Sequence, residues 1–220
     1  MINTYIYLSH FLDEDTVIYG GERSIKINKV RDLENGDTAN TKTIFFHNHS
    51  GTHIDFPNHF INDGLKSDDY DANYWNFSYP FLINLPCNEN CIIIPEMISI
   101  DEIPIESDFI IIKTGFEKYR GGEKYWKNNP GLSPDLSQLL KKRCPNLKII
   151  GMDFISITSF QNRELGRIAH KNFLGENLLL IEDMHLTELT KTPIDIVCLP
   201  LLMSGLDGAP ITIIAKIAKT

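Results

Sequence analysis

Four of the chain's seven histidines lie within residues 45–60, FFHNHSGTHIDFPNHF. His49, His53, Asp55 and His59 all stand at odd positions. In an extended chain, residues of one parity point to the same side. The spacing therefore predicts a strand that presents imidazoles and a carboxylate on one face.

A helix would fit this segment poorly. It would bring His49 and His53 together but would send Asp55 well round the axis. Gly51 and Pro57 also argue against a helix, because glycine adds backbone freedom and proline removes a hydrogen-bond donor. We therefore expect an extended segment that bends at Ser50–Gly51.

Such a row of side chains has the composition of a metal site. Neutral imidazole nitrogen and carboxylate oxygen are ligands of Zn²⁺ and related divalent ions. Two histidines and one carboxylate supply three ligands and leave a position open for water, as catalytic sites do. A bound ion lowers the pKa of that water to ~7. A further histidine outside the ligand set would move protons, because its ordinary pKa of ~6.5 lies near working pH.

The remaining histidines carry weaker signals. His47 shares the parity of the cluster, and we interpret it as a supporting or structural residue rather than a ligand. His10 and His185 have no partner pattern, and we interpret them as structural. His170 and Glu182 are candidate distant ligands, but sequence spacing alone does not connect them to the first cluster.

The elements that must position these residues are mostly strands. Short runs rich in β-branched and aromatic residues recur along the chain, including TVIYG at 16–20 and DFIIIKT at 108–114. A helix is expected after Ser133 as N-cap with Pro134 at its first position, and Pro145 stops it. A second helix is expected over roughly 160–174, capped by Gly175.

These elements predict one α/β domain, strand-rich in its N-terminal half, spanning residues 1–220. Of the 220 residues, 42% are hydrophobic, which is enough for one full-sized core. The net charge of -8 argues against nucleic acid as a partner and gives no signal for an anionic membrane.

Cysteine usage and the absence of long apolar runs suggest a compartment. Cys87 and Cys91 are spaced too widely for a zinc-ribbon pair, and no second pair follows. No disulfide framework is implied, which favours a reducing environment. Neither a secretory apolar region nor a membrane-spanning run of ~20 residues is present. We expect a cytoplasmic protein.

The motif His49-Ser-Gly-Thr-His53-Ile-Asp55-Phe-Pro57-Asn-His59-Phe60 resembles HxGTHxDxPxHF, the motif of the metal-dependent cyclase-like hydrolases. This family includes bacterial kynurenine formamidases (arylformamidases) and isatin hydrolases. Four further segments are similar to family patterns: LSHFLDEDTVIYGGE (8–22), IIGMDFIS (149–156), AHKNFLGENLLLIEDMHL (169–186) and LPLLMSGLDGAPITIIAKI (199–217). The resemblance covers nearly the whole chain.

The resemblance implies a role for each residue of the motif. His49, His53 and Asp55 would bind one zinc ion, and Asp55 would bridge to a second ion held by His170 and Glu182. His59 would act as general acid/base. One or two Zn²⁺ ions are expected, with Mn²⁺ as the alternative.

The resemblance also implies an architecture. The family fold is a swivelling β/β/α single domain, strand-rich, usually assembled as a homo-oligomer, so a homodimer or homotetramer is expected here.

The implied activity is hydrolysis of an amide-type C–N bond in a small molecule, most simply a formamide such as N-formylkynurenine, an intermediate of tryptophan catabolism. One alternative is hydrolysis of a cyclic amide, imide or lactone, as in isatin hydrolases. Another is a non-catalytic metal- or ligand-binding relative, although His59 argues against it. Three departures from the family pattern lie in segments that would border the substrate: Tyr19-Gly20-Gly21, Asp153-Phe154-Ile155-Ser156 and His170-Lys171.

Aromatic residues gather in DDYDANYWNFSYPF, residues 68–81. Their side chains would line either a substrate pocket or a packed loop or interface, and we favour the second interpretation. The residues concerned are Tyr70, Tyr74, Trp75 and Phe77.

Overall fold

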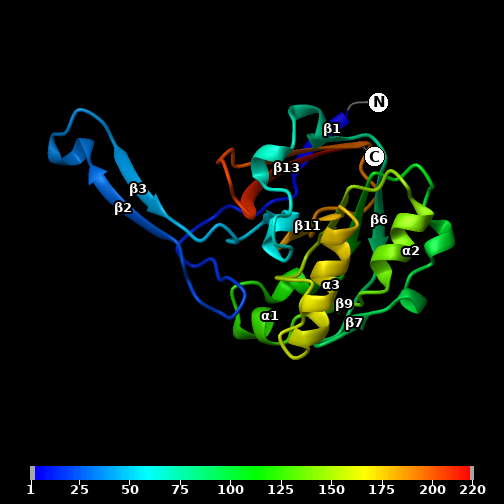
Figure 1. The fold of residues 1–220 in the computed structure, drawn as a ribbon. Coiled ribbons are helices and arrows are strands. Elements are labelled where there is room, and N and C mark those ends of the chain that lie inside the picture. The colour runs from blue at the N-terminus through cyan, green and yellow to red at the C-terminus, as the bar shows by residue number, and fades with distance from the viewer. Residues whose placement is uncertain (1–2, 219–220) are drawn as a thin grey trace.

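The computed structural model describes residues 3–218, which form a strand-rich α/β fold (Figure 1). The strands are β1 (Asn3–Tyr7), β2 (Lys26–Arg31), β3 (Thr41–Phe45), β4 (His53–Asp55), β5 (Asn76–Phe77), β6 (Pro80–Asn84), β7 (Ile92–Ile93), β8 (Phe109–Lys113), β9 (Gly131–Leu132), β10 (Ile149–Met152), β11 (Leu179–Glu182), β12 (Asp195–Pro200) and β13 (Gly208–Ala218). The α-helices are α1 (Glu123–Lys127), α2 (Leu136–Arg143) and α3 (Arg163–Gly175). The 3-10 helices are η1 (Leu33–Asn35), η2 (Pro57–His59), η3 (Ser67–Asp69), η4 (Ala72–Trp75), η5 (Pro95–Met97), η6 (Ile100–Glu102) and η7 (Phe116–Tyr119).

A nine-stranded sheet organises the molecule. Its order is β5-β12-β13-β4-β11-β10-β8-β6, and β1 pairs along β13. The segment β6, β8, β10 and β11 is parallel, whereas β4 runs antiparallel to both β11 and β13. The short strand β4 therefore joins the parallel segment to the antiparallel one, and it carries the centre of the histidine motif.

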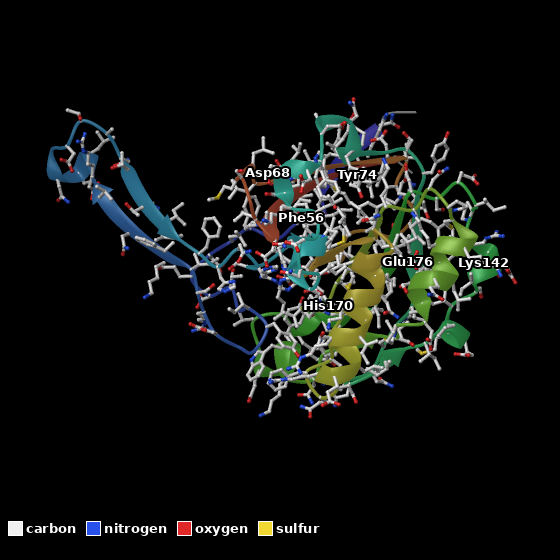
Figure 2. The ribbon with its side chains drawn as sticks, in the orientation of Figure 1. Phe56, Asp68, Tyr74, Lys142, His170 and Glu176 are labelled. Carbon is white, nitrogen blue, oxygen red and sulfur yellow. The ribbon has the colours of Figure 1, made fainter. Side chains whose placement is uncertain are left out.

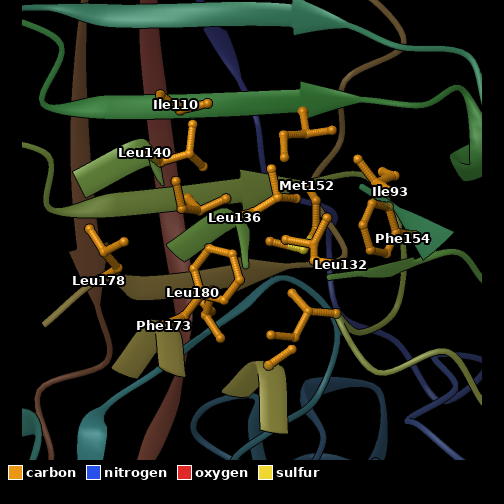
Figure 3. Packing of buried hydrophobic residues seen from close by; sticks show 14 of the residues in the cluster. Ile93, Ile110, Leu132, Leu136, Leu140, Met152, Phe154, Phe173, Leu178 and Leu180 are labelled. Atoms are coloured by element: carbon orange, nitrogen blue, oxygen red, sulfur yellow. The ribbon is translucent and has the colours of Figure 1, made fainter. Parts of the chain in front are cut away.

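Alternation along β8 explains how the sheet is covered. Ile110 and Ile112 belong to one buried cluster, and Phe109 and Ile111 belong to another. Successive side chains of a strand point to opposite faces, so the run is apolar without interruption because both faces are buried. In the first cluster, side chains of α2 and α3 pack on the sheet, as Figure 3 shows for Leu140 and Phe173. In the second, residues of β12 and β13 pack against β8 and β11.

The hairpin of β2 and β3 projects away from the rest of the molecule (Figure 1, blue). Its surface is apolar at several positions, and Val30, Ile44 and Phe45 are each more than half exposed. We call this hairpin the arm. Its exposed apolar side chains at Val30, Ile44 and Phe45 thus stay in contact with solvent in the single chain.

Several expectations about the elements need correction. Residues 16–20 form no strand beyond an isolated bridge at Val17. The helix after Pro134 begins at Leu136 with Asp135 at the N-cap position, so Ser133 is not the cap. The second helix extends through Gly175, and Glu176 takes the C-cap position.

None of the helices between residues 3 and 218 combines the length and the apolar composition that a membrane span requires.

Candidate metal centre

The register between β4 and β11 brings two candidate ligands, His53 and Glu182, together. His53 pairs with Glu182 on β11, and Asp55 pairs with Gly208 on β13. All three strand residues of β4 are buried. Glu182 ends β11, so the site lies at the carboxyl end of the parallel strands, where open α/β sheets bind their ligands.

The prediction of an extended segment that bends at Ser50–Gly51 is confirmed at the bend, but less of the segment is a strand than expected. Only His53–Asp55 forms a strand. Gly51 turns the chain with φ of 62°, and Pro57–His59 is a 3-10 helix. These two turns, rather than strand parity, bring His49 and His59 to the same side of β4.

Helix α3 supplies His170 (Figure 2). Its Nδ1 lies 2.9 Å from the carbonyl oxygen of Gly166, one turn earlier, and 3.1 Å from Thr158 Oγ1. The helix approaches residue 158 closely, because a Cβ at Gly166 would lie 2.6 Å from Thr158 Cα. These contacts leave His170 Nε2 pointing toward β4.

Four residues from distant parts of the chain form a closed ring of alternating imidazoles and carboxylates. His53 Nε2 lies 3.5 Å from Asp55 Oδ1 and 3.5 Å from Glu182 Oε2. His170 Nε2 lies 3.7 Å from Asp55 Oδ2 and 3.5 Å from Glu182 Oε1. Each carboxylate thus gives one oxygen to each histidine. We call these four residues the quartet.

The quartet has the donor types of a divalent metal site, and the ligand atoms of His53, Asp55 and Glu182 lie within 4.8 Å of one another, close enough to share an ion. Zinc bonds of 2.0–2.2 Å in a tetrahedral arrangement place neighbouring donor atoms roughly 3.4 Å apart. The quartet's nitrogen-to-oxygen distances of 3.5–3.7 Å match that value and are long for hydrogen bonds. His53 Nδ1 donates to the carbonyl oxygen of Gly51 at 2.8 Å, which leaves its Nε2 lone pair free for a metal.

The segment at residues 156–158 contacts both Glu182 and His170 of the quartet. Ser156 Oγ and Ile157 N donate to Glu182 Oε1 at 3.0 and 2.8 Å. The next residue, Thr158, contacts His170. The motif at residues 149–156 resembled a family pattern, but its role as a support for two candidate ligands was not predicted.

His49 and His59 lie beside the quartet. His49 Nδ1 is 2.8 Å from Asp55 Oδ1, and its Nε2 is 3.1 Å from Asp207 Oδ2. His59 Nδ1 is 2.8 Å from the same Asp207 oxygen, and the two imidazoles stack with centroids 4.0 Å apart. Ligand atoms of His49, Asp55 and His59 also lie close enough to share an ion. His49 would have to exchange one of its two carboxylate contacts to become a ligand.

Asp207 was not predicted from the sequence. It lies in LPLLMSGLDGAPITIIAKI, the last segment that resembled the family, and this was the one available signal. The following Gly208 allows the close approach, because a Cβ there would lie 2.2 Å from His49 Cε1.

The carboxylates control the protonation of these histidines. Burial alone would lower the pKa of His49, but hydrogen bonds to Asp55 and Asp207 raise it to about 9. The reciprocal contact with His49 holds the pKa of Asp55 well below its usual range despite its burial. Burial lowers the pKa of His59, against the raising effect of Asp55. His59 is therefore neutral near pH 7, as a general base must be.

A cavity of about 310 Å³ opens onto the site. His49, His53, His59, His170 and Glu182 all line it, and so does His47, which is exposed. Apolar walls come from Val17, Ile18, Tyr19, Phe60 and Ile155, and positive charge comes from Arg163 and Arg167 of α3.

The aromatic stretch at residues 68–81 does not line this cavity. Trp75 and Phe77 are buried in the second core cluster, and Tyr70 and Tyr74 pack against it. Figure 2 labels Tyr74 well away from His170. The interpretation as packed structure, rather than substrate pocket, is the one the structure supports.

Comparison with known proteins agrees with this architecture. The family model described as "Putative cyclase" matches residues 6–159. The chain belongs to the cyclase family. A kynurenine formamidase from Geobacillus thermodenitrificans is 26% identical over 211 residues, which cover 96% of each chain. A kynurenine formamidase from Bacillus cereus is 24% identical over 212 residues, covering 96% of this chain and 97% of the relative.

Solved structures of the cyclase family share the fold. Isatin hydrolase A from Labrenzia aggregata superposes with a TM-score of 0.83 at 20% identity, over 99% of this chain and 94% of the other. A potential metal-dependent hydrolase with cyclase activity gives 0.78 at 18% identity, with each chain fully covered. The predicted family and strand-rich α/β fold class are therefore confirmed.

Proposed function

We propose that this cyclase-family chain is a metal-dependent hydrolase that cleaves an amide-type C–N bond, most simply that of a formamide such as N-formylkynurenine. The quartet carries the proposal, because its donor atoms fit a divalent ion and its open side faces a cavity that also contains His59. The similarity to kynurenine formamidases over 96% of the chain supports the reaction class.

His53, Asp55, His170 and Glu182 would hold the ion, with His49 as a further ligand or the partner of a second ion. Zn²⁺ suits this mixture of imidazole and carboxylate, and Mn²⁺ is the alternative. A bound divalent ion would polarise the substrate carbonyl and lower the pKa of a water molecule.

His59 would carry the proton in both halves of the reaction. Asp207 holds its Nδ1, which directs Nε2 toward the cavity as the reactive nitrogen. Nε2 would accept a proton as water oxygen attacks the carbonyl carbon. It would then give that proton to the nitrogen as the C–N bond breaks, so that formate and a free amine leave.

The cavity walls suggest what the substrate carries. Among the described residues, Arg163 and Arg167 supply the lysine or arginine side chains that line the cavity, and Glu182 is the carboxylate that lines it. A substrate with a carboxylate and an aromatic body would place its charge at the arginines and its ring against Tyr19 and Phe60. This arrangement favours an amino-acid formamide over a neutral ring.

Hydrolysis of a cyclic amide or related ring is the second candidate, since isatin hydrolases share the fold at a TM-score of 0.83. A substrate panel containing N-formylkynurenine, other formamides and cyclic amides separates the two. Arg167→Gln should raise KM for N-formylkynurenine about 10-fold and leave KM for a neutral ring unchanged. An unchanged KM for N-formylkynurenine, together with faster hydrolysis of a cyclic amide by the native chain, would favour the ring hydrolase.

Metal analysis combined with the same panel tests the whole proposal. His53→Ala and Glu182→Gln should lower both bound metal and hydrolysis at least ~100-fold, while the exposed Glu188→Gln should change neither. A purified chain that binds no divalent metal, together with unchanged hydrolysis in His53→Ala, would sink the mechanism.

We also propose that the chain forms a homodimer or a homotetramer through its arm. The exposed apolar residues of β2 and β3 have the composition of a subunit interface, and burying them against a second copy would stabilise an assembly.

A further inference from the structure

A second group of candidate ligands lies outside the cavity. His10 follows β1, Glu117 belongs to η7 and His185 follows β11, so three separate segments contribute. Their ligand atoms all lie within 4.8 Å of one another. None of the three lines the cavity of the quartet. No sequence pattern paired either histidine with a partner, because their contact depends on how these three segments pack.

One carboxylate oxygen serves both imidazoles. Glu117 Oε1 lies 3.5 Å from His10 Nε2 and contacts His185 Nδ1. The other oxygen, Oε2, accepts the Leu186 N–H at 2.8 Å. Glu117 is buried, with its side chain 7% exposed, so this hydrogen bond fixes the direction in which Oε1 points.

His10 Nε2 is a buried nitrogen with no hydrogen-bond partner among residues 3–218. A buried polar atom left unpaired costs about 1–3 kcal/mol, which a bound ligand would recover. Its 3.5 Å separation from Glu117 Oε1 lies in the range of 3.5–3.7 Å found within the quartet, as expected for two donors that share an ion.

Hydrogen bonds of the backbone hold both histidines in place. The His10 N–H donates to Thr52 Oγ1 at 2.9 Å, and the His185 N–H donates to the Leu8 carbonyl oxygen at 3.0 Å. Neither bond uses the imidazoles: within residues 3–218, His10 Nε2 stays unpaired, and His185 Nδ1 contacts only the carboxylate of Glu117. The side chain of His185 is 34% exposed, so an ion here would keep a position open to water.

The neighbouring fixed charges do not oppose a cation. Arg120 is the nearby guanidinium, and Asp183 binds it at two oxygens with distances of 2.9–3.0 Å. This pair is close to neutral as a unit.

We propose that His10 Nε2, Glu117 Oε1 and His185 Nδ1 bind a divalent transition-metal ion such as Zn²⁺, at a site distinct from the quartet. Two imidazoles and one carboxylate with a solvent position form an ordinary zinc ligand set. The ion would tie the segment after β1 to η7 and to the chain after β11, and it would stabilise the fold by binding only the folded chain.

Zinc titration of the full-length chain, stripped with a chelator, tests this proposal. The variant His53→Gln/His170→Gln disables the quartet, and Glu117→Gln in that background then tells whether a remaining tight site lies at Glu117 or at His49, Asp55 and His59. We expect that background to retain about one zinc per chain and to melt at a higher temperature with zinc than without. Adding Glu117→Gln should weaken the remaining site at least ~10-fold and abolish the zinc-dependent rise in Tm.

Glu188→Gln in the same background is the matched control and should leave the remaining site unchanged. Circular dichroism identifies any variant that fails to fold. In that case, anomalous diffraction at the zinc edge from zinc-loaded native crystals decides the question. A peak bonded to His10, Glu117 and His185 supports the proposal. Its absence, or a quartet-disabled chain that binds no zinc, overturns it.

Discussion

His59 Nδ1 and Asp207 Oδ2 lie 2.8 Å apart although 148 positions separate them in the chain. The same oxygen contacts His49 Nε2. Asp207 therefore fixes the tautomer of His59. It also holds the two stacked imidazoles of His49 and His59 beside each other. A carboxylate that orients a histidine in this way acts through that histidine and does not touch the substrate itself.

Asp207→Asn should reduce kcat about 10- to 100-fold with a smaller change in KM, because His59 loses the ionised partner that orients it. Asp207 also raises the pKa of His59, against the lowering effect of burial. The acidic limb of the kcat/KM profile should therefore move to lower pH. Steady-state kinetics across pH measure both effects, and the exposed Asp101→Asn is the control. A loss of activity with an unshifted profile would point to a purely structural role.

Gly166→Ala should lower metal affinity and activity at least ~10-fold and destabilise the fold by about 1–3 kcal/mol. The added Cβ would meet Thr158 atoms at 2.3–2.6 Å, and the displaced helix would carry His170 with it. Gly175→Ala, in the same helix, has no neighbour closer than 4.0 Å. It should be neutral or slightly stabilising. Zinc titration and urea unfolding distinguish the two, and equal effects would contradict the close docking of α3.

The metal-free chain should be most stable between about pH 4 and pH 6.5. His49 has a folded pKa raised to about 9, so its contribution is complete below the unfolded value of 6.5 and is lost as pH rises toward 9. The pKa of Asp55 is depressed, so its contribution is present above the unfolded value and is lost as pH falls below it.

Urea unfolding of the chelator-treated protein at a series of pH values measures this profile. The loss on the alkaline side should be on the order of 1–3 kcal/mol, and His49→Gln should flatten it. A profile that stays level between pH 6.5 and pH 9 would contradict the His49 contacts.

Ile44→Asp/Phe45→Asp should reduce the molecular mass in solution to that of a smaller assembly. Charges placed on the arm's apolar surface would be buried in an interface without partners. Thr43→Asp lies on the same exposed strand but removes no apolar side chain, so it serves as the matched control. Light scattering reports the mass. A native chain that is monomeric at micromolar concentration would remove the arm from consideration as an interface.

The sequence predicted which residues of the quartet come together better than it predicted the path of the chain between them. The residue types from His49 to His59, together with the family resemblance, identified every member of the quartet before the fold was known. The bend at Ser50–Gly51 was predicted, but the 3-10 helix at Pro57–His59 was not, because strand parity does not encode such a local turn. The short apolar runs were correctly predicted as strands such as β8 and β11, because parallel strands buried on both faces have continuous apolar sequences.

What sequence reasoning missed were contacts between distant segments that the family motif does not include. Asp207 is an ordinary acid in a glycine-rich loop until β13 places it beside β4. His10 and His185 likewise become neighbours only through the antiparallel bridge between Ser9 and Met184. Tertiary packing creates the contact of Asp207 with His49 and that of His10 with His185, and no local sequence pattern predicts either contact.

The segment Ser156–Thr158 has a consequence for any attempt to change the metal preference of this protein. Because it contacts both Glu182 and His170, the two side chains share one support and are energetically coupled. Substitutions at the two positions should be non-additive in a double-mutant cycle. Redesigning Glu182 alone would also disturb His170, and the reverse holds as well. A new ion specificity would therefore require changes at both side chains and at the segment Ser156–Thr158 together.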